Sequence, residues 1–127
     1  MGFELRKNPT SVQDFRDDEE VRQKYYPEME ALIKRATGAS HVFLFDHTVR
    51  KSSVTNLNAL GGAAAGSVVR VHCDYTSESA PRRFLQLCET ESYTGQKFDR
   101  AEVEKLMEGR FAFVNCWRPI RDEPVKV

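Results

Sequence analysis

The chain has 127 residues, and its 19 Lys and Arg residues balance its 19 Asp and Glu residues, so its formal net charge is zero. This length predicts one domain, because domains cluster at about 100–150 residues. The balanced charge argues against a dedicated nucleic-acid-binding protein, which usually carries a basic surface. No apolar run approaches the roughly 18 residues of a membrane helix, and the N-terminal residues lack the apolar segment of a secretory signal.

The three cysteines are an odd number, and none of them has the CxxC spacing that is typical of zinc sites. A disulfide framework or a structural zinc site is therefore not expected. Reduced thiols are the rule in the cytosol, so we expect a cytoplasmic protein with neither a nucleic-acid nor a membrane partner.

The first third of the chain predicts two helices. Asp17, followed three residues later by Glu20, has the spacing of a capping box. Pro27 suits the first turn of a second helix, because the N–H that proline lacks would be unpaired there. An apolar stripe at helical spacing follows, and Gly38 is the residue expected to end this helix.

The rest of the chain alternates predicted strands with loops and helices. Three segments rich in β-branched and aromatic residues predict strands, at 41–49, 67–76 and 110–120. The sequence Ser-Ala-Pro at 79–81 begins a helix that is predicted to reach about Cys88. Asp99 with Glu102 forms a second capping box, ahead of a helix that Gly109 ends.

This order of elements predicts an α+β fold with few strands and a single domain over 1–127. The expected parts, in chain order, are an extended arm at 1–16, helices at 17–38, a sheet-forming segment at 41–120 with a loop at 50–66, and a polar tail at 121–127.

The tripeptide His72-Cys73-Asp74 is the sharpest local signal for chemistry. In a strand, residues i and i+2 point to the same side, so the imidazole and the carboxylate would project together. A 2-His-1-carboxylate facial triad, which holds Fe(II) in oxygenases, often receives two of its ligands in this way. The alternative is a histidine at a strand end that hydrogen bonds to its neighbour.

Five segments, in this order, resemble a fungal family of hydroxylase/desaturases: YYPEMEALIKRATGAS, HVFLFDHTVR, VHCDYT, SAPRR and GRFAFVNCWRPI. The family includes asaB-type hydroxylase/desaturases, gibberellin desaturase-like proteins and cephem methoxylase (CmcJ)-like proteins, and it serves mostly secondary metabolism. The resemblance runs from about Asp17 to Ile120. It implies a partial double-stranded β-helix, or jelly roll, over 41–120, and an oxygenase that uses Fe(II) and 2-oxoglutarate to hydroxylate or desaturate a small molecule.

The same resemblance implies roles for individual residues of this chain. His72 and Asp74 match the first two iron ligands of the family. Tyr75 and Thr76, which follow directly, would orient Asp74 by hydrogen bonds. His47 lies in another matching block, where a structural or substrate-facing role suits it.

The block Asn-x-Trp-Arg-Pro supplies Asn115, Trp117 and Arg118. On a strand, Asn115 and Trp117 share a face with Phe111 and Phe113, so they would line a pocket. Arg118 would point to the other face and could clamp a carboxylate bidentately. The alternatives are a core position for Trp117 and a surface salt bridge for Arg118.

The chain departs from the family in its histidines, because none follows Asp74. In the family, the second iron-binding histidine and the arginine that pairs with 2-oxoglutarate lie beyond the Trp-Arg-Pro block. We therefore expect a C-terminally truncated relative, and three explanations stay open: a fragment of a longer enzyme, a natural short relative that acts as a catalytically inactive binding or interaction module, or a third ligand from His41 or His47. A shortened jelly roll would expose a sheet edge, which predicts a homo-oligomer.

Overall fold

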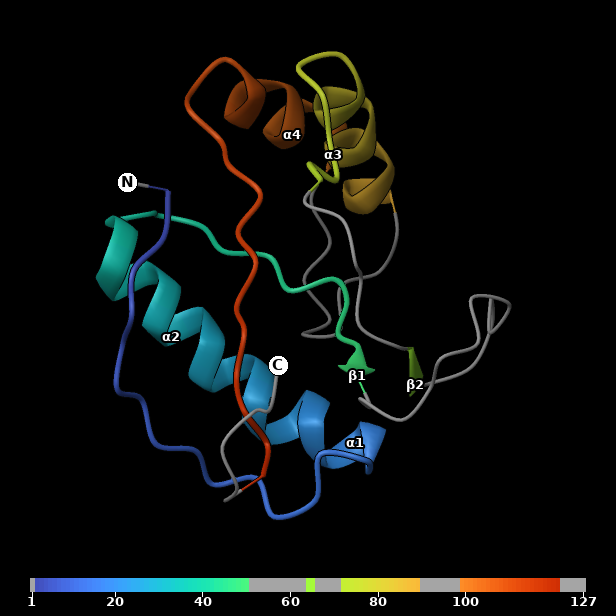
Figure 1. Cartoon of the computed structure of the whole chain (residues 1–127). Helices are drawn as coiled ribbons and strands as arrows, with labels where there is room; N and C mark the ends of the chain where they lie inside the picture. Colours follow the sequence, from blue (N-terminus) through green and yellow to red (C-terminus); the bar gives the residue numbers. More distant parts are fainter. Residues whose placement is uncertain (1, 51–63, 66–71, 90–98, 122–127) are drawn as a thin grey trace. The chain divides into compact units, whose positions relative to one another are not determined.

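The computed structural model describes residues 2–50, 64–65, 72–89 and 99–121. In chain order these residues form α1 (Asp18–Glu20), η1 (Val21–Tyr25), α2 (Tyr26–Thr37), β1 (Val49–Arg50), β2 (Ala64–Ala65), α3 (Ser79–Glu89) and α4 (Arg100–Met107) (Figure 1). The chain divides into two compact units, which are described separately: unit 1 is Met1–Leu44 with Cys116–Val127, and unit 2 is Phe45–Asn115. The single domain stays a prediction.

The helical run of unit 1 begins at Asp17. Its side chain accepts hydrogen bonds from the N–H groups of Glu19 (3.0 Å) and Glu20 (3.2 Å). Only half of the predicted capping box forms, because the Glu20 carboxylate accepts from the N–H groups of Gln13 (3.1 Å) and Asp14 (2.9 Å). The Glu20 carboxylate therefore connects the N-terminal arm to the helix, and Asp17 alone caps the helix N-terminus.

The helical run continues without a break from α1 to α2. A π-helical turn, η1, connects them, and Pro27 lies in the first turn of α2, as predicted. Gly38 ends α2 in the left-handed conformation, with a φ of 73°, and its N–H donates to the Lys34 carbonyl. Glycine suits this position because it has no Cβ to clash there.

The core of unit 1 lies where the N-terminal arm meets this helical run. Val12, Val21 and Tyr26 are buried, with exposed fractions of 7%, 1% and 2%. Phe15 and Tyr25 pack against them with their rings edge to face, 5.2 Å between centroids. Edge-to-face aromatic pairs add to the stabilisation that burial provides.

In unit 2, α3 and α4 confirm the two helices predicted there, and they contact each other. Both halves of the second capping box form, since Glu102 N–H donates to Asp99 (2.8 Å) and Asp99 N–H donates to Glu102 (3.2 Å). Leu87 of α3 and Val103 of α4 are buried.

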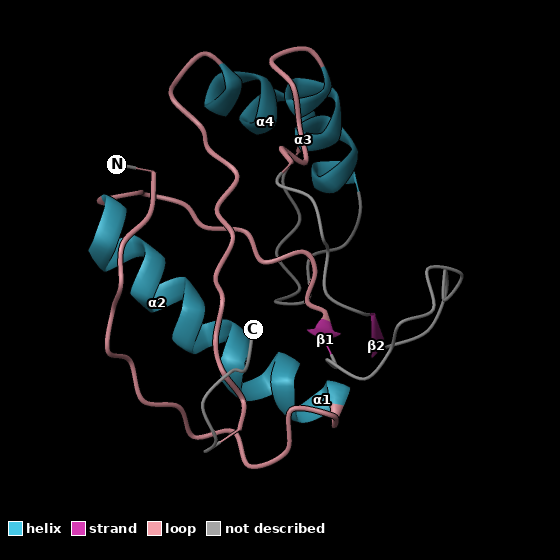
Figure 2. Ribbon diagram, in the orientation of Figure 1, coloured by secondary structure: helices cyan, strands magenta, loops and turns pink. Residues whose placement is uncertain are grey.

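Strand pairing among the described residues is confined to β1 and β2 (Figure 2). They pair in parallel, with Val49 opposite Ala64 and Arg50 opposite Ala65, and β2 falls within the segment that was predicted as a loop. The three predicted strands are otherwise irregular wherever they are described, over 41–48, 72–76 and 110–120, while 67–71 lie outside the described residues. Residue preference favours a strand, but a ladder needs a hydrogen-bonded neighbour. The jelly-roll core stays a prediction.

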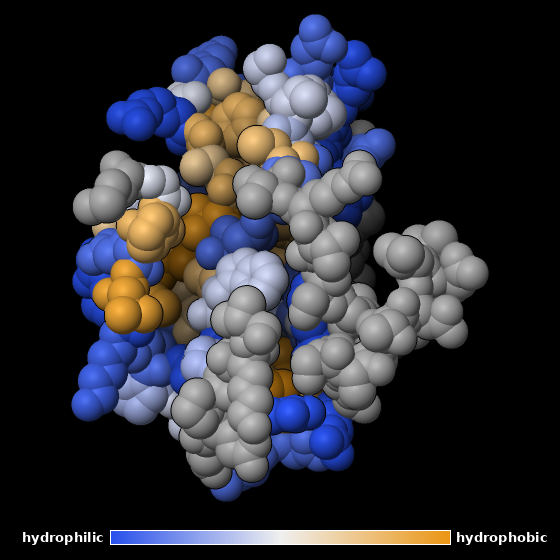
Figure 3. Space-filling model, viewed as in Figure 1, coloured by the Kyte–Doolittle hydropathy of each residue, from blue (hydrophilic) through white to orange (hydrophobic). Residues whose placement is uncertain are grey.

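Several large apolar side chains of unit 1 are exposed. Figure 3 shows hydrophobic residues, in orange, on the visible face of the molecule. The exposed fractions are 84% for Phe3, 96% for Leu5 and 79% for Trp117. None of the helices in the described part of the chain has the length and apolarity that crossing a bilayer requires.

Glu20 makes the stability of unit 1 depend on pH. A hydrogen bond from Lys24, with those from the backbone of Asp14 and Gln13, lowers the pKa of Glu20 from 4.5 to about 2. A carboxylate with a lowered pKa contributes stability above pH 4.5, and this contribution disappears as the pH falls from 4.5 towards 2.

We therefore expect Glu20→Gln to lower the Tm at pH 7 and to have little effect at pH 2. Thermal melts from pH 7 to pH 2 would measure this loss. Glu19→Gln, one residue away and bonded to Gln23, is the matched control and should keep the wild-type pH profile. Parallel wild-type and Glu20→Gln profiles would contradict the assignment.

Candidate functional site

Unit 2 brings the predicted metal-binding pair together. His72 Nε2 lies 3.2 Å from Asp74 Oδ1, and the two side chains are 51% and 47% exposed. The side chains therefore project to the same side, as their i, i+2 spacing predicts, although this segment is not a paired strand. Solvent, or an ion from solvent, can reach both of them.

Asn115 holds the second oxygen of the same carboxylate. Its Nδ2 donates a hydrogen bond of 3.0 Å to Asp74 Oδ2, from a position 41 residues further along the chain. One oxygen of Asp74 thus faces the imidazole of His72 while the other is fixed by an amide. Such contacts to a metal-binding carboxylate set its orientation.

The side chains of Tyr75 and Thr76 contact other groups. The ring of Tyr75 stacks on Phe113, with 4.3 Å between centroids and 28° between planes. Thr76 Oγ1 accepts from Ser79 N–H (3.1 Å) and bonds to the Ser79 hydroxyl (3.2 Å). The orienting contact that the sequence assigned to Tyr75 and Thr76 is therefore supplied by Asn115.

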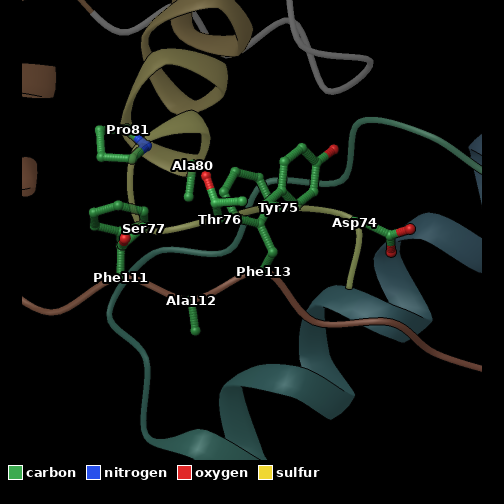
Figure 4. A pocket seen from close by; sticks show the side chains of 9 residues that line it. All are labelled: Asp74, Tyr75, Thr76, Ser77, Ala80, Pro81, Phe111, Ala112 and Phe113. Carbon is green, nitrogen blue, oxygen red and sulfur yellow. The ribbon is translucent and has the colours of Figure 1, made fainter. Parts of the chain in front are cut away.

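Asp74 is one of the residues that line a pocket of about 400 Å³ (Figure 4). Its lining comes from the segment that follows His72, from the first turn of α3, and from Phe111, Ala112 and Phe113. In Figure 4, Phe111 and Phe113 point to one side of their segment and Ala112 points to the other, as the predicted alternation requires. Phe111 and Phe113 thus line this pocket, whereas Asn115 and Trp117, which the sequence predicted to line one, are not in its lining.

Trp117 and Arg118 belong to unit 1, where Trp117 is exposed and Arg118 contacts other residues of the unit. Trp117 is 79% exposed, so the core position that was its alternative role is wrong. The guanidinium of Arg118 donates to the Asn8 carbonyl and to the Tyr25 hydroxyl (3.3 Å), and it lies over the Tyr25 ring at 5.5 Å. Among the residues that the structure describes, these contacts replace the surface salt bridge that was the alternative role of Arg118, and the carboxylate clamp stays a prediction.

Arg118 also affects an acidic side chain of α2. Burial acts to raise the pKa of Glu28, but hydrogen bonds from Thr10 and Ser11 and the charge of Arg118 outweigh it, so the pKa is lowered. Ser11 donates to Glu28 from both its N–H (2.8 Å) and its hydroxyl (2.7 Å). These bonds hold the N-terminal arm against α2.

The other histidines do not join the pair. His47 is half-buried in unit 2, and His41 is exposed in unit 1. Across the ranges that the structure describes, no group of three or more His, Cys, Asp or Glu side chains could hold a metal ion. A third ligand from His41 or His47 is thus not supported by the described residues.

The geometry of the pair fits a divalent ion that is bound by nitrogen and oxygen. Imidazole nitrogens and carboxylate oxygens bind such ions at about 2.1 Å, so two ligands at right angles lie roughly 3.0 Å apart. The 3.2 Å between His72 Nε2 and Asp74 Oδ1 is close to this separation, and it equally matches the direct contact between the two side chains that the sequence left open as the alternative. A metal between them would have two ligands from this segment, with Asn115 behind the carboxylate.

Comparisons with known proteins agree with these motifs. A family model described as "Oxidoreductase/YMDC permease-like domain" matches residues 1–127. The alpha-ketoglutarate-dependent dioxygenase phiK of a fungal species is 34% identical, over 94% of this chain and 40% of phiK. The hydroxylase/desaturase efuI of Hormonema carpetanum is 31% identical, over 100% of this chain and 43% of efuI. The Fe(II)/2-oxoglutarate-dependent dioxygenase nvfI of Aspergillus novofumigatus is 31% identical, over 93% of this chain and 37% of nvfI.

The chain spans about two fifths of the length of these curated relatives. No solved structure matches it. The relatives confirm the resemblance to fungal hydroxylase/desaturases and 2-oxoglutarate-dependent dioxygenases that the sequence motifs indicated.

Asn115→Ala should weaken metal binding by about tenfold, because loss of a group that orients a metal ligand typically costs 10–100-fold in affinity. Co(II) is a suitable probe, and isothermal titration of the full chain measures its affinity. His72→Ala and Asp74→Ala should lower the affinity further. His41→Ala removes a histidine from unit 1 and is the control, which should bind Co(II) as the wild type does. Equal affinities for Asn115→Ala and the wild type would contradict this role.

Arg118→Ala should lower the free energy of unfolding by about 1–3 kcal/mol, because the lost hydrogen bonds have a charged donor. Urea denaturation would measure this change, while Co(II) affinity should stay at the wild-type value. Arg121→Ala, which removes an exposed arginine three residues later, is the matched control. If both variants unfolded at the same urea concentration, Arg118 would have no stabilising role.

Proposed function

Since the chain belongs to the family described as "Oxidoreductase/YMDC permease-like domain", we propose that it serves Fe(II)- and 2-oxoglutarate-dependent hydroxylation or desaturation of a small molecule in fungal secondary metabolism. The observation that carries this proposal is the arrangement of His72, Asp74 and Asn115. The imidazole and the carboxylate face each other at a separation that suits a metal ion, and the amide fixes the carboxylate.

In this proposal His72 and Asp74 hold the iron. His72 contributes a neutral nitrogen and Asp74 an ionised oxygen, the donor types that suit Fe(II). Asn115 donates its hydrogen bond to the far oxygen of Asp74, so that the near oxygen keeps its direction. Fe(II), with 2-oxoglutarate as a co-substrate that is itself oxidised, would allow O₂ to act as the oxidant that removes hydrogen from a C–H bond.

Three further statements belong to the same proposal. The segment 41–120 contributes to a jelly-roll core, which the family resemblance supports. The chain forms homo-oligomers, supported by the exposed Phe3, Leu5 and Trp117, because large exposed apolar side chains favour association. The reaction takes place in the cytoplasm, for which the support is the cysteine content.

Anaerobic titration of the full chain with Fe(II) and 2-oxoglutarate tests the proposal. If the co-substrate chelates an iron that the chain holds, a metal-to-ligand charge-transfer band should appear in the visible spectrum. The band should be absent in Asp74→Ala and intact in His41→Ala.

Admitting air should then convert 2-oxoglutarate to succinate and CO₂ in the wild type. If the wild type gave neither the band nor succinate, the proposal would be wrong, and a binding module without turnover would be the alternative.

A further inference from the structure

The pocket at Asp74 has a mainly apolar lining. Phe111 and Phe113 form one part of it, Tyr75 another, and Ala80 and Pro81 of α3 a third (Figure 4). All three aromatic side chains are only half-buried, so part of each ring stays accessible. Ligand pockets of proteins typically have volumes of about 300–1,000 Å³ and apolar linings, and this one lies within that range.

The rings are held by one another. Phe113 stacks on Tyr75 and meets Phe111 edge to face, with 6.3 Å between the Phe111 and Phe113 centroids. Phe111 in turn packs against Phe84 of α3 at 5.1 Å. Because these contacts fix the rings before a ligand arrives, binding costs little further ordering of the side chains.

The charge around the pocket favours an uncharged ligand. Asp74 is the acidic residue in the lining, and the lining has no Lys, Arg or His. The guanidinium of the nearby Arg83 lies over the Phe45 ring at 5.8 Å. In the metal-free chain, an anionic ligand would therefore meet a carboxylate with no lining cation to offset the repulsion.

We propose that this pocket binds a neutral, flat, ring-containing small molecule, which stacks on one of its aromatic rings and contacts the others at their edges, since Phe111 is nearly perpendicular to Phe113. Flat rings stack on aromatic faces, and a saturated, puckered ring of the same size cannot make that contact over its full area. Asp74 belongs both to the metal pair and to the lining, so the bound ring lies beside a metal ligand. That this molecule is the substrate rests on the proposed function.

The test uses 1-naphthol as the probe and the metal-free full chain, with binding followed by saturation-transfer NMR. Decahydro-1-naphthol is the puckered comparison and should bind more weakly. Ala80→Leu should weaken 1-naphthol binding by about tenfold or more, because in Figure 4 the Ala80 methyl points from α3 toward the rings. Ala101→Leu makes the same change at an exposed position of α4 and should bind 1-naphthol as the wild type does.

Ser77→Leu is a second blocking variant, at an exposed residue of the lining, and it keeps the test valid if circular dichroism shows that Ala80→Leu fails to fold. Wild-type affinity in the folded blocking variants, or equal binding of the two alcohols, would overturn the proposal. The probe binds without iron, so the outcome is separate from the iron titration. If naphthol binds but no iron band appears, the pocket proposal stands and the proposed reaction is wrong. If the iron band appears but naphthol does not bind, the proposed reaction stands and the pocket proposal is wrong.

Discussion

The carboxylate of Asp74 is the group on which the site of unit 2 depends. Its two oxygens have different partners, an imidazole two residues away and an amide 41 residues away. The bond from Asn115 ties the segment at 110–115 to the segment at 72–76, and so it brings Phe113 onto the ring of Tyr75. Hydrogen bonds to a charged group are stronger than neutral ones, so a single bond of this kind can set the position of a segment that has no strand partner.

In unit 1, hydrogen bonds of other charged side chains likewise position an irregular segment. Glu28 of α2 accepts two bonds from Ser11, and Arg118 donates to Asn8. Together these bonds seat the N-terminal arm on the helix, where Val12 is buried in the core. In both units, charged side chains that form long-range hydrogen bonds position segments that lack regular secondary structure.

The structural features that could be predicted from the sequence are those that depend on residues close together in the chain. The capping box of Asp99 and Glu102, and Gly38 at the end of α2, could be identified because their partners lie within four residues. The side-by-side projection of His72 and Asp74 follows from their spacing in the same way.

Features that depend on distant partners could not be derived. The Glu20 carboxylate bonds to Gln13 and Asp14 of the N-terminal arm as well as to Lys24, so the pattern indicated a full capping box where only half forms. Arg118 contacts Tyr25 from 93 residues away, and no local pattern could distinguish this contact from a carboxylate clamp. The predicted strands likewise depend on ladder partners that residue preference does not specify.

X-ray absorption at the iron edge of the full chain, loaded anaerobically with Fe(II), tests the central claim most directly. It reports the atoms around the metal itself. The account predicts an imidazole signal in the wild type that His72→Ala abolishes and that His41→Ala and His47→Ala leave unchanged. An imidazole signal that persists in His72→Ala, or is absent from the wild type, would contradict the account.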